Sequence, residues 1–448
     1  MNSINSIVER IKAFDEKEAV FWNDKTYSYS DLSRLIDQWL ERFKKAGIAE
    51  KHICAFYGEY SPQICGLIYA LMLNKNILVP FTPAMGRDLD EFSEMAGIDW
   101  LIKFDRNDDW EIQKIDKYPV KNQLIINFYQ RNVPGLIVFT SGSTGKPKGI
   151  LQDCENVMKK FLEIRPGWKT VLFLMMDHFG GFNTLLSVFA YGGTAVCLPD
   201  RKPETVCEVI EKSKADLLPA TPTFLNLLIA SNAYKNFDLS SVKLITYGTE
   251  VMMDATLNAV KSIFPNCRIK QTYGLSELGV LRSKSESDNS VWVKLGGQGF
   301  ETKIVDNILW IRSQAVMVGY LNADNPVDED GWMSTGDEVE VKGEYMRILG
   351  RKSDMINVGG LKVFPAEVES VLLQDENIAE ASVFGKPHPV MGNIVIAKVV
   401  LVQAEDKFAM TERLRKLCMS KLAKYKVPVK FVIEETDLHN ARYKKIRK

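Results

Sequence analysis

The chain has 448 residues, of which 46% are hydrophobic and 25% are charged, values typical of a globular protein. Lysine and arginine together number 57, and so do aspartate and glutamate, so the formal net charge is zero. The length predicts two or three domains, and the balanced charge argues against nucleic acid or an anionic membrane as the main partner.

The sequence shows no signal for membrane insertion or export. No stretch reaches the length and apolarity of a membrane span, and the first residues lack a basic region followed by an apolar one, so we expect a cytoplasmic protein. The seven cysteines are scattered and odd in number, which predicts reduced thiols in the core. None of the four histidines stands at a metal-ligand spacing, and a zinc site is not expected.

Strands and helices alternate along the first part of the chain. In order, the patterns predict a helix over Ile4–Phe14, a hairpin over Ala19–Tyr29, a helix capped by Ser30 or Asp31 and ended by Gly47, a strand over Ile53–Tyr57, a helix from Ser61 to about Leu73, and a strand over Ile77–Pro80. Residues 105–123 are polar and irregular, and we expect a loop there with a possible edge strand.

The alternation continues past residue 149. The predicted elements are the strand Val171–Leu174, helix Asn183–Tyr191, strand Ala195–Leu198, helix Pro203–Lys214, strand Leu217–Leu218, helix Pro222–Ala230, strand Leu244–Tyr247, helix Met253–Phe264 and strand Ile269–Thr272. Repeated units of this kind with nearly continuous apolar strands predict parallel sheets that are covered on both faces. Ligands of such folds bind where the strands end.

The pattern changes in the last third of the chain. Short alternating strands with glycine turns over Val291–Ile348 predict a small β subdomain. After Gly350 and Arg351 the chain predicts a compact α+β domain, with helices over Pro365–Leu373 and Thr411–Leu422 and strands over Ala381–Phe384, Ile394–Val402 and Val429–Ile433. The expected fold class is therefore α/β, with a large N-terminal domain (1–350) of parallel βα sheets plus the β subdomain, followed by a small C-terminal α+β domain (351–448).

A loop rich in glycine, hydroxyl groups and lysine follows the apolar strand Leu136–Phe139. It runs Thr140-Ser141-Gly142-Ser143-Thr144-Gly145-Lys146-Pro147-Lys148-Gly149. Glycines let backbone amides turn inward, and hydroxyls and lysines add donors and positive charge, so the loop suits a polyphosphate. A solvated Gly/Ser loop is the alternative. The spacing differs from that of a P-loop NTPase, since Thr140 stands at the first glycine position and Pro147 follows the lysine.

Three further clusters carry chemistry. In Tyr273-Gly274-Leu275-Ser276-Glu277, the tyrosine offers a flat face for a base and the carboxylate an oxygen ligand for Mg²⁺. Asp337 follows a tight turn and could accept both hydroxyls of a ribose. Gly350–Gly360 combines charge and glycine at the domain boundary, which suits a hinge. The alternatives are a strand-to-helix turn, a turn-forming aspartate and a plain linker.

Together the four clusters, in this order and separation, resemble the adenylate-forming superfamily, which includes acyl- and aryl-CoA synthetases, nonribosomal-peptide adenylation domains and firefly luciferase. The resemblance is nearest to the acyl-CoA synthetase-like AMP-binding ligases and covers nearly the whole chain. Thr140–Gly149 matches the family's phosphate loop, Tyr273–Glu277 its Tyr-Gly-x-Thr-Glu segment with Ser276 for threonine, Thr335–Asp337 its ribose motif, and Gly350–Gly360 its domain-linking motif.

The resemblance implies a two-step reaction that uses ATP, Mg²⁺ and a thiol. A carboxylate attacks the α-phosphate of ATP, pyrophosphate leaves, and the acyl-adenylate passes to coenzyme A or to the phosphopantetheine of a carrier protein. The residues implied to bind the nucleotide are Thr140, Ser141, Gly142, Ser143, Thr144, Gly145, Lys146, Lys148, Gly248, Thr249, Tyr273, Gly274, Ser276, Asp337 and Arg351. The metal would lie with Thr144 and Glu277, which count as catalytic together with His178.

The resemblance also implies a catalytic lysine at the end of the chain and a mobile C-terminal domain. Residues 438–448 align with the family's Leu-Pro-x-Thr-x-x-Gly-Lys-Ile pattern and place Lys445 between the carboxylate and the α-phosphate. Lys444 stands where the family has glycine, so the two lysines could compete for the role. Ser353 takes the hinge position, at which the family usually has Asp or Lys.

The acid substrate is indicated by a few residues only. His178 falls at a gate position where acyl- and aryl-CoA synthetases have histidine or an aromatic residue. Phe179 follows it, where amino-acid-activating relatives carry an amine-binding aspartate, so a non-amino carboxylic acid is expected, although Asp177 lies close. With Phe182 and Tyr247 these residues predict an apolar pocket. A carrier-loading adenylation enzyme and a non-catalytic nucleotide-binding relative stay open as alternatives.

Overall fold

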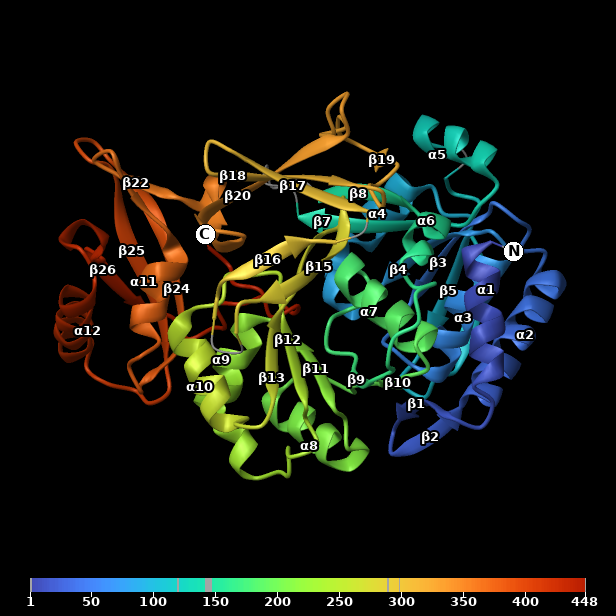
Figure 1. The fold of residues 1–448 in the computed structure, drawn as a ribbon, viewed down its shortest axis with the longest axis horizontal. Coiled ribbons are helices and arrows are strands. Elements are labelled where there is room, and N and C mark those ends of the chain that lie inside the picture. The colour runs from blue at the N-terminus through green and yellow to red at the C-terminus, as the bar shows by residue number, and fades with distance from the viewer. Residues whose placement is uncertain (1, 119–120, 142–146, 288–289, 298, 448) are drawn as a thin grey trace.

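The computed structural model describes residues 2–118, 121–141, 147–287, 290–297 and 299–447. In these residues the chain builds four β-sheets, flanked by helices (Figure 1). The helices are α1 (Ser3–Ala13), α2 (Tyr29–Ala46), α3 (Pro62–Leu73), α4 (Leu89–Ala96), α5 (Gln123–Phe128), α6 (Cys154–Lys159), α7 (Phe179–Ala190), α8 (Pro203–Ser213), α9 (Pro222–Ser231), α10 (Asp254–Ile263), α11 (Pro365–Leu372) and α12 (Lys407–Lys421).

Two of the sheets are mainly parallel. The first has the order β13 (Arg268–Gln271), β12 (Leu244–Tyr247), β11 (Leu217–Ala220), β9 (Lys169–Val171), β10 (Thr194–Val196), β1 (Glu18–Trp22) and β2 (Lys25–Ser28). The second has the order β19 (Gly319–Tyr320), β8 (Pro147–Asp153), β7 (Gly135–Ser141), β4 (Ile77–Phe81), β3 (Ile53–Tyr57), β5 (Trp100–Phe104) and β6 (Trp110–Lys114). Antiparallel pairing occurs near the edges of these sheets, where β2, β6 and β19 are edge strands and β8 pairs antiparallel with both β19 and β7.

The third sheet is antiparallel and corresponds to the predicted β subdomain. Its order is β14 (Tyr273–Leu275), β15 (Gly279–Ser285), β16 (Val293–Gly296), β21 (Tyr345–Arg351), β20 (Trp332–Lys342), β18 (Ile308–Ser313) and β17 (Phe300–Val305). It therefore begins at Tyr273 and not at Val291. The early start matters because it makes Tyr273 part of the same sheet as Asp337 on β20.

The fourth sheet forms the C-terminal domain with α11 and α12. Its strands are β23 (Leu361–Val363), β22 (Ile356–Val358), β25 (Gly392–Leu401), β24 (Ile378–His388) and β26 (Lys430–Ile433). The chain leaves the third sheet at Arg351 and enters the fourth at Ile356, through a short 3-10 turn. The predicted fold class, with a large domain of parallel sheets and a small C-terminal domain, is confirmed.

Separate apolar cores hold these parts together. Helices α1, α2, α3 and α7 bury their side chains in one cluster that also contains Phe56 of β3 and Ala195 of β10, so this core joins the two parallel sheets. The C-terminal domain has a core of its own, formed between its sheet and α11 and α12. All seven cysteines are free and buried, as predicted. Among the described helices, none is long and apolar enough to cross a membrane.

Local signals explain both the agreement and the differences with the predicted elements. Ser61 caps α3 and Pro62 opens it, as predicted. Helix α2 is capped by Ser28, whose hydroxyl accepts from the amide of Asp31, while the Asp31 carboxylate accepts from the amide of Ser28. The predicted cap at Ser30 or Asp31 is therefore wrong by two or three residues. Strand β6 is the possible edge strand of residues 105–123, whereas α4 and β5 were not predicted.

Candidate nucleotide and acid site

The predicted phosphate loop joins the antiparallel strands β7 and β8. Gly142, Ser143, Thr144, Gly145 and Lys146 lie outside the described residues, as does the side chain of Ser141. At the base of the loop, Thr140 pairs with Lys148 across the two strands. Asn322 braces the exit of the loop, because its side chain accepts from the amide of Gly149 (3.2 Å) and donates to the carbonyl of Pro147 (2.8 Å).

Tyr320 brings Lys148 and Glu277 to the same place. Its hydroxyl donates to Glu277 Oε1 over 2.7 Å, and the ammonium of Lys148 lies 4.7 Å from the centre of its ring. Burial and the Glu277 carboxylate both raise the pKa of Tyr320, so the phenol stays protonated and donates. The carbonyl of the neighbouring Ser276 accepts from Gln152 of β8 over 2.5 Å. The predicted metal ligand Glu277 thus lies beside the strand that leaves the phosphate loop.

The donor set fits a hard cation. Glu277 is half-buried and offers carboxylate oxygens, which are the ligands that Mg²⁺ prefers. Its predicted partner Thr144 lies in the segment that is not described.

Tyr273 and Asp337 meet across the third sheet. The hydroxyl of Tyr273 donates to Oδ2 of Asp337, and Arg351 Nε lies 3.7 Å from Oδ1. Asp337 is only 8% exposed, and this burial raises its pKa, although the Tyr273 hydroxyl and Arg351 act in the opposite direction. Three residues that the sequence assigned to adenine and ribose are therefore in contact. The ring of Tyr273 packs largely in the core of this sheet.

Gly248 lies against the segment that precedes Tyr273. A Cβ atom at Gly248 would lie 2.6 Å from Oγ1 and 2.8 Å from the carbonyl oxygen of Thr272, so no side chain fits. The next residue, Thr249, has a left-handed backbone with φ of 69°. Gly274 is equally confined, since its Cβ would lie 2.8 Å from the carbonyl of Gly279. Two segments predicted to bind the nucleotide, Gly248–Thr249 and Tyr273–Glu277, are thus placed side by side after the ends of β12 and β13.

The predicted acid-binding residues divide into two groups. Phe179, Phe182 and Tyr247 are at most 1% exposed and belong to the cores of the N-terminal domain. His178 is half-buried at the start of α7. Burial, with the nearby charges of Lys444 and Arg442, lowers the pKa of His178 well below its usual value, so its imidazole is neutral at neutral pH. His178 is therefore the member of this set that is placed near the C-terminal residues.

Asp177 is fully buried and is already paired. Its Oδ2 accepts from the hydroxyl of Thr82 over 2.8 Å and from Arg442 Nη2 over 2.7 Å. Two buried atoms of this pair, Asp177 Oδ1 and Arg442 Nε, have no hydrogen-bond partner among the described residues. The sequence had marked Asp177 as a possible ligand for an amine. Thr82 and Arg442 carried no signal, because each lies far from Asp177 along the chain.

A hairpin at the end of the chain connects the domains. It runs from Leu438 to Ile446, and Figure 1 shows this red segment passing from the C-terminal domain toward the N-terminal domain. The hydroxyl of Thr221, at the start of α9, donates to the carbonyl of Tyr443 over 2.8 Å. The ring of Tyr443 packs against Phe173 and Phe224, with centroids 5.6 and 5.7 Å away. The hairpin is therefore docked between strand ends of the first sheet.

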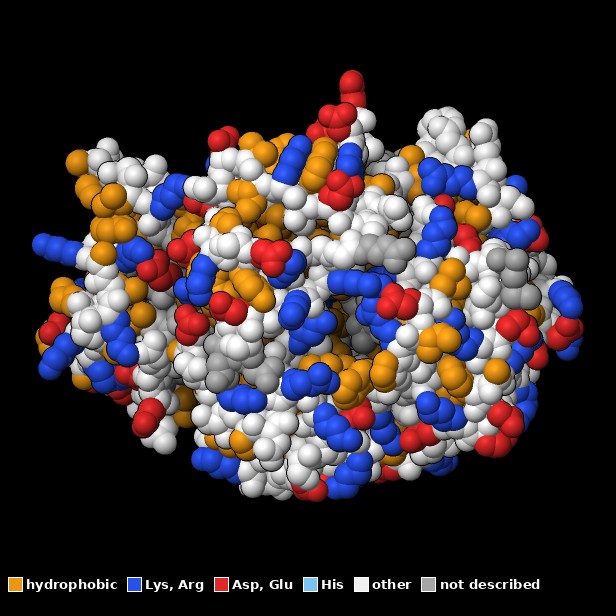
Figure 2. Space-filling view, viewed as in Figure 1, with side chains coloured by type: hydrophobic (Ala, Val, Ile, Leu, Met, Phe, Trp, Pro, Cys, Tyr) orange, Lys and Arg blue, Asp and Glu red, His pale blue; other side chains and the backbone are white. Residues whose placement is uncertain are grey.

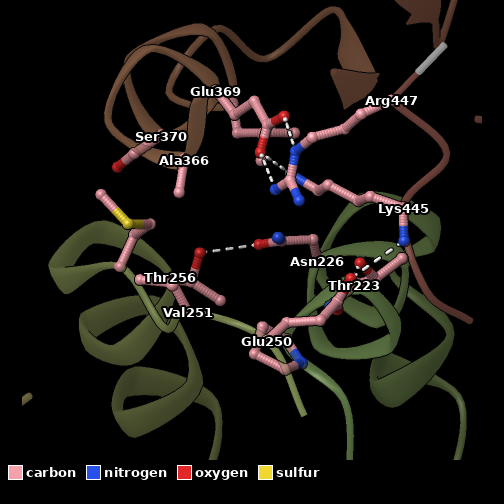
Figure 3. Close-up of a pocket in the computed structure, with 13 residues that line it drawn as sticks. Thr223, Asn226, Glu250, Val251, Thr256, Ala366, Glu369, Ser370, Lys445 and Arg447 are labelled. Carbon is pink, nitrogen blue, oxygen red and sulfur yellow. Dashed lines mark hydrogen bonds and ion pairs between the residues drawn. The ribbon is translucent and has the colours of Figure 1, made fainter. Parts of the chain in front are cut away.

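Lys445, the predicted catalytic lysine, lines a pocket between the domains (Figure 3). Its amide donates to Glu250 Oε1 over 2.9 Å, and its ammonium lies 3.0 Å from Oε2 of Glu369 on α11. Arg447 donates to both oxygens of the same carboxylate, over 3.1 and 3.0 Å. Burial raises the pKa of Glu369, but Lys445 and Arg447 outweigh it and lower the value to about 2. The ammonium of Lys445 thus pairs within its own domain.

A cluster of three titratable side chains lies at the base of the hairpin. Glu380, Asp437 and His439 place potential ligand atoms within 4.8 Å of one another. His439 Nδ1 is 2.7 Å from Glu380 Oε2. Although burial lowers it, the pKa of His439 is raised overall by Glu380, so a direct ion pair accounts for the cluster. The hinge candidate Ser353 is exposed, in the turn Lys352–Asp354 between the third and fourth sheets.

The surface view supports a local positive potential. Figure 2 shows Lys and Arg side chains around a hollow near the middle of the displayed face. The chain as a whole has a formal net charge of zero, so positive charge that attracts an anion must come from such a local group of side chains.

Comparison with known families decides the assignment. The profile described as AMP-binding enzyme matches residues 7–321, and the profile described as AMP-binding enzyme C-terminal domain matches residues 367–445. The chain belongs to the AMP-binding enzymes of the adenylate-forming superfamily. Residues 322–366 of this AMP-binding enzyme lie between the two matches and contain Asp337, Arg351 and Ser353.

The similarity to known proteins extends over nearly the full length of this AMP-binding enzyme. An indoleacetate–CoA ligase of Aromatoleum aromaticum is 25% identical over 96% of this chain and 94% of that protein. A 2-succinylbenzoate–CoA ligase of Bacillus pumilus is 25% identical with the same coverage. Among solved structures, the anthranilate CoA ligase AuaEII in complex with anthranoyl-AMP has a TM-score of 0.82 and 19% identity, covering 99% of this chain and 95% of that chain. The latter likeness supports the fold.

Proposed function

We propose that this AMP-binding enzyme activates a carboxylic acid with ATP and transfers the acyl group to coenzyme A. The carboxylate oxygen attacks the α-phosphorus, the bond to pyrophosphate breaks, and the thiol then displaces AMP from the acyl-adenylate. The observation that carries the proposal is the docking of a lysine-bearing hairpin on the loops that hold Asp177, His178 and Glu250. Cationic groups at that point offset the repulsion between two anionic reactants.

The nucleotide is assigned to the contact between the first and third sheets. We place adenine beside Gly248 and Tyr273 and the ribose at Asp337 and Arg351, because these residues meet there. Lys148 and the undescribed loop would hold the phosphates. Mg²⁺, when bound at Glu277 and Thr144, would neutralise phosphate charge. Tyr320 holds the Glu277 carboxylate in place for this role through the 2.7 Å hydrogen bond.

The acid is proposed to lack an α-amino group. Asp177 is the nearby carboxylate that could bind an ammonium, and Arg442 already neutralises it at 2.7 Å. A second buried cation there would remain uncompensated, at a cost of several kcal/mol. The names of the relatives, which include indoleacetate and 2-succinylbenzoate ligases, agree with organic acids as substrates.

The seven free, buried cysteines suit a reducing cytoplasm.

A pyrophosphate-exchange screen over aliphatic, aromatic and α-amino acids tests the first step. We expect exchange with non-amino acids only, and exchange restricted to α-amino acids would contradict the assignment of Asp177. The acceptor is tested by adding free coenzyme A to the enzyme with its acyl-adenylate. Rapid release of AMP supports coenzyme A, whereas release only with a phosphopantetheinylated carrier protein supports the carrier-loading alternative. A chain that supports no exchange with any acid would be a non-catalytic relative.

The domain boundary is proposed at residues 350–351, with Ser353 as the hinge of a mobile C-terminal domain. Ser353 is exposed, and its hydroxyl contacts only the neighbouring Asp354, at 3.1 Å, among the described residues. Proline at this position would fix the φ angle and restrict the residue before it. We expect Ser353→Pro to retain pyrophosphate exchange and to lose most thioester formation. Equal loss of both steps would speak against a hinge here.

A further inference from the structure

The end of the chain carries two adjacent lysines on a tight hairpin. The amide of Ile446 donates to the carbonyl of Leu438 over 2.8 Å, and the amide of Asn440 donates to the carbonyl of Lys444 over 2.9 Å. The Asn440 side chain closes the tip by accepting from the amides of Arg442 (3.0 Å) and Lys444 (3.1 Å). Lys445 forms a β-bridge with His439 and its ammonium pairs with Glu369, a contact that Lys444 does not make.

The side chain of Lys445 forms its ion pair within the C-terminal domain. Its side chain is 14% exposed and its ammonium pairs with Glu369, which is 2% exposed (Figure 3). If Lys445 left, the buried Glu369 would keep only Arg447 as a charged partner among the described residues. Such a pair fixes the position of the hairpin, and it withdraws the Lys445 ammonium from reactants bound to the N-terminal domain.

Lys444 has the opposite character. Its ammonium forms no ion pair with a carboxylate in the described part of the chain, although it is buried enough for its pKa to fall. Glu250 acts against this fall, while Arg442 and Arg351 add to it. The charge of Lys444 also lowers the pKa of His178, which lies at the start of α7. The geometry agrees with this placement, because Lys444 stands between Tyr443, whose carbonyl accepts from Thr221 (2.8 Å), and Lys445, whose amide donates to Glu250 (2.9 Å). Lys444 therefore lies at the candidate site without an ion-pair partner among the described residues.

The backbone supports the same distinction. Among the residues of the hairpin that the structure describes, Tyr443 has a left-handed backbone, with φ of 52°. Glycine is the residue that adopts this conformation without strain, and glycine is what the family pattern has immediately before its catalytic lysine. In this chain Tyr443 adopts the conformation that glycine favours. The residue that follows it is Lys444.

We propose that Lys444, and not Lys445, is the catalytic lysine of adenylation, and that Lys445 is a positioning residue that anchors the hairpin through Glu369. This inference rests on the proposed function. The Lys444 ammonium stays protonated throughout and donates hydrogen bonds to the attacking carboxylate and the α-phosphate. The new bond joins the carboxylate oxygen to the α-phosphorus, and the broken bond releases pyrophosphate with its electron pair, so no proton transfer is required.

The experiment compares Lys444→Met with Lys445→Met, which both keep the apolar stem and remove the charge. The first readout is pyrophosphate exchange with ATP, Mg²⁺ and the acid that the wild-type enzyme accepts best. The second is thioester formation from the corresponding synthetic acyl-adenylate and coenzyme A, a step that does not need adenylation. The third is the thermal unfolding of each variant. Glu369→Gln joined to Lys445→Met provides a variant that lacks two of the three charges of the anchor and keeps Arg447.

We expect Lys444→Met to lower the rate of pyrophosphate exchange by about 100-fold or more. Its rate of thioester formation should stay within about threefold of wild type, and its unfolding temperature should stay close to that of wild type. Lys445→Met should unfold at lower temperature but retain exchange to within about tenfold where it is folded. The double variant should be less stable still, because Arg447 also loses its partner Glu369, but it should show no further loss of exchange where it is folded. Arginine at position 444 should restore little activity, because its planar group differs in reach and geometry.

The opposite ranking, with exchange abolished in folded Lys445→Met and kept in Lys444→Met, overturns the proposal. Equal loss of exchange in both folded variants also overturns it, since Lys445 would then be needed for chemistry. If the wild-type chain supports no exchange with any acid, the proposed function fails instead.

Discussion

Arg442 Nη2 lies 2.7 Å from Oδ2 of Asp177, and this ion pair joins the C-terminal hairpin to the core of the N-terminal domain. Asp177 is fully buried, whereas the side chain of Arg442 is 20% exposed. Removing the arginine leaves a buried carboxylate whose remaining hydrogen-bond donor, in the described residues, is Thr82. The pair therefore couples domain docking to the integrity of the acid site.

Arg442→Gln is expected to weaken docking by about 2 kcal/mol, or about 30-fold in the rate of pyrophosphate exchange, because a buried charge loses its partner. Joining it to Asp177→Asn should recover part of the loss, since neither charge then remains. Arg106→Gln, at an exposed position of the N-terminal domain, serves as the matched control. Additive effects of the two single substitutions would argue against direct coupling.

Tyr273→Phe tests the proposed ribose site. Burial already raises the pKa of Asp337, so its charged form is lost at a higher pH than that of an exposed aspartate. Without the Tyr273 hydroxyl the pKa should rise further, and the KM for ATP should increase at a higher pH as the medium is acidified. At pH 8 we expect an increase in KM of about tenfold, the value of one hydrogen bond to a charged group.

The measurement is the KM for ATP from pH 8 down to pH 5. Tyr234→Phe, which removes a hydroxyl near the surface that bonds to Asn232 at 3.3 Å, is the control and corrects for the titration of ATP itself. Parallel pH profiles for the two variants would contradict a role for Tyr273 in holding Asp337.

Gly248→Ala tests whether the nucleotide lies beside the Tyr247–Thr249 segment. The added methyl group would meet Thr272 at 2.6 Å, and the loop must shift to accept it. We expect the KM for ATP to rise by about tenfold or more, since overpacking costs about 1–3 kcal/mol. Gly180→Ala is the control, because its methyl group would meet Leu174 at an ordinary 3.8 Å. An unchanged KM would place adenine elsewhere.

Glu369→Gln tests the anchor of the hairpin through stability. The pKa of Glu369 is lowered to about 2, against 4.5 for an unperturbed group, so its charge stabilises the folded state above pH 4.5. That contribution is lost as the pH falls from 4.5 through 2. The substitution should lower the free energy of unfolding at pH 7 by about 3 kcal/mol.

Denaturant unfolding at several pH values measures this effect. The difference between Glu369→Gln and wild type should be constant from pH 7 to about pH 5 and should shrink below it. Glu376→Gln, which replaces an exposed acidic residue of the same domain, is the control. A difference that does not change with pH would indicate lost packing and not a lost charge.

The sequence predicted those parts of the site that depend on local signals. Apolar strands and the residues just after them are encoded within a few positions. The resemblance to the adenylate-forming family assigned Tyr273, Asp337 and Gly248 to one nucleotide site, and this assignment stays a prediction, although Tyr273 and Asp337 are in contact. The prediction of an apolar pocket for the acid has less support from the structure. Hydrophobicity alone does not separate a pocket wall from a core, and the structure places Phe179 and Phe182 in the core.

What could not be predicted depends on which side of an element faces a neighbour. The contact of Thr82, Asp177 and Arg442 joins segments that are far apart in sequence, with no local pattern to indicate it. The side of the hairpin on which each lysine lies depends on the left-handed backbone of Tyr443, which an alignment by residue type does not contain. Both features are set by tertiary packing.

The left-handed tyrosine has a consequence for the catalytic cycle. A bulky residue in this conformation stores about 1–2 kcal/mol of backbone strain, and two of its three aromatic neighbours, Phe173 and Phe224, belong to the N-terminal domain. If the proposed hinge at Ser353 lets the C-terminal domain rotate, Tyr443 would leave those two rings and the turn could relax. The first half-reaction would then be switched off by the same movement that opens the way for the thiol, and the finished adenylate would be shielded from reversal.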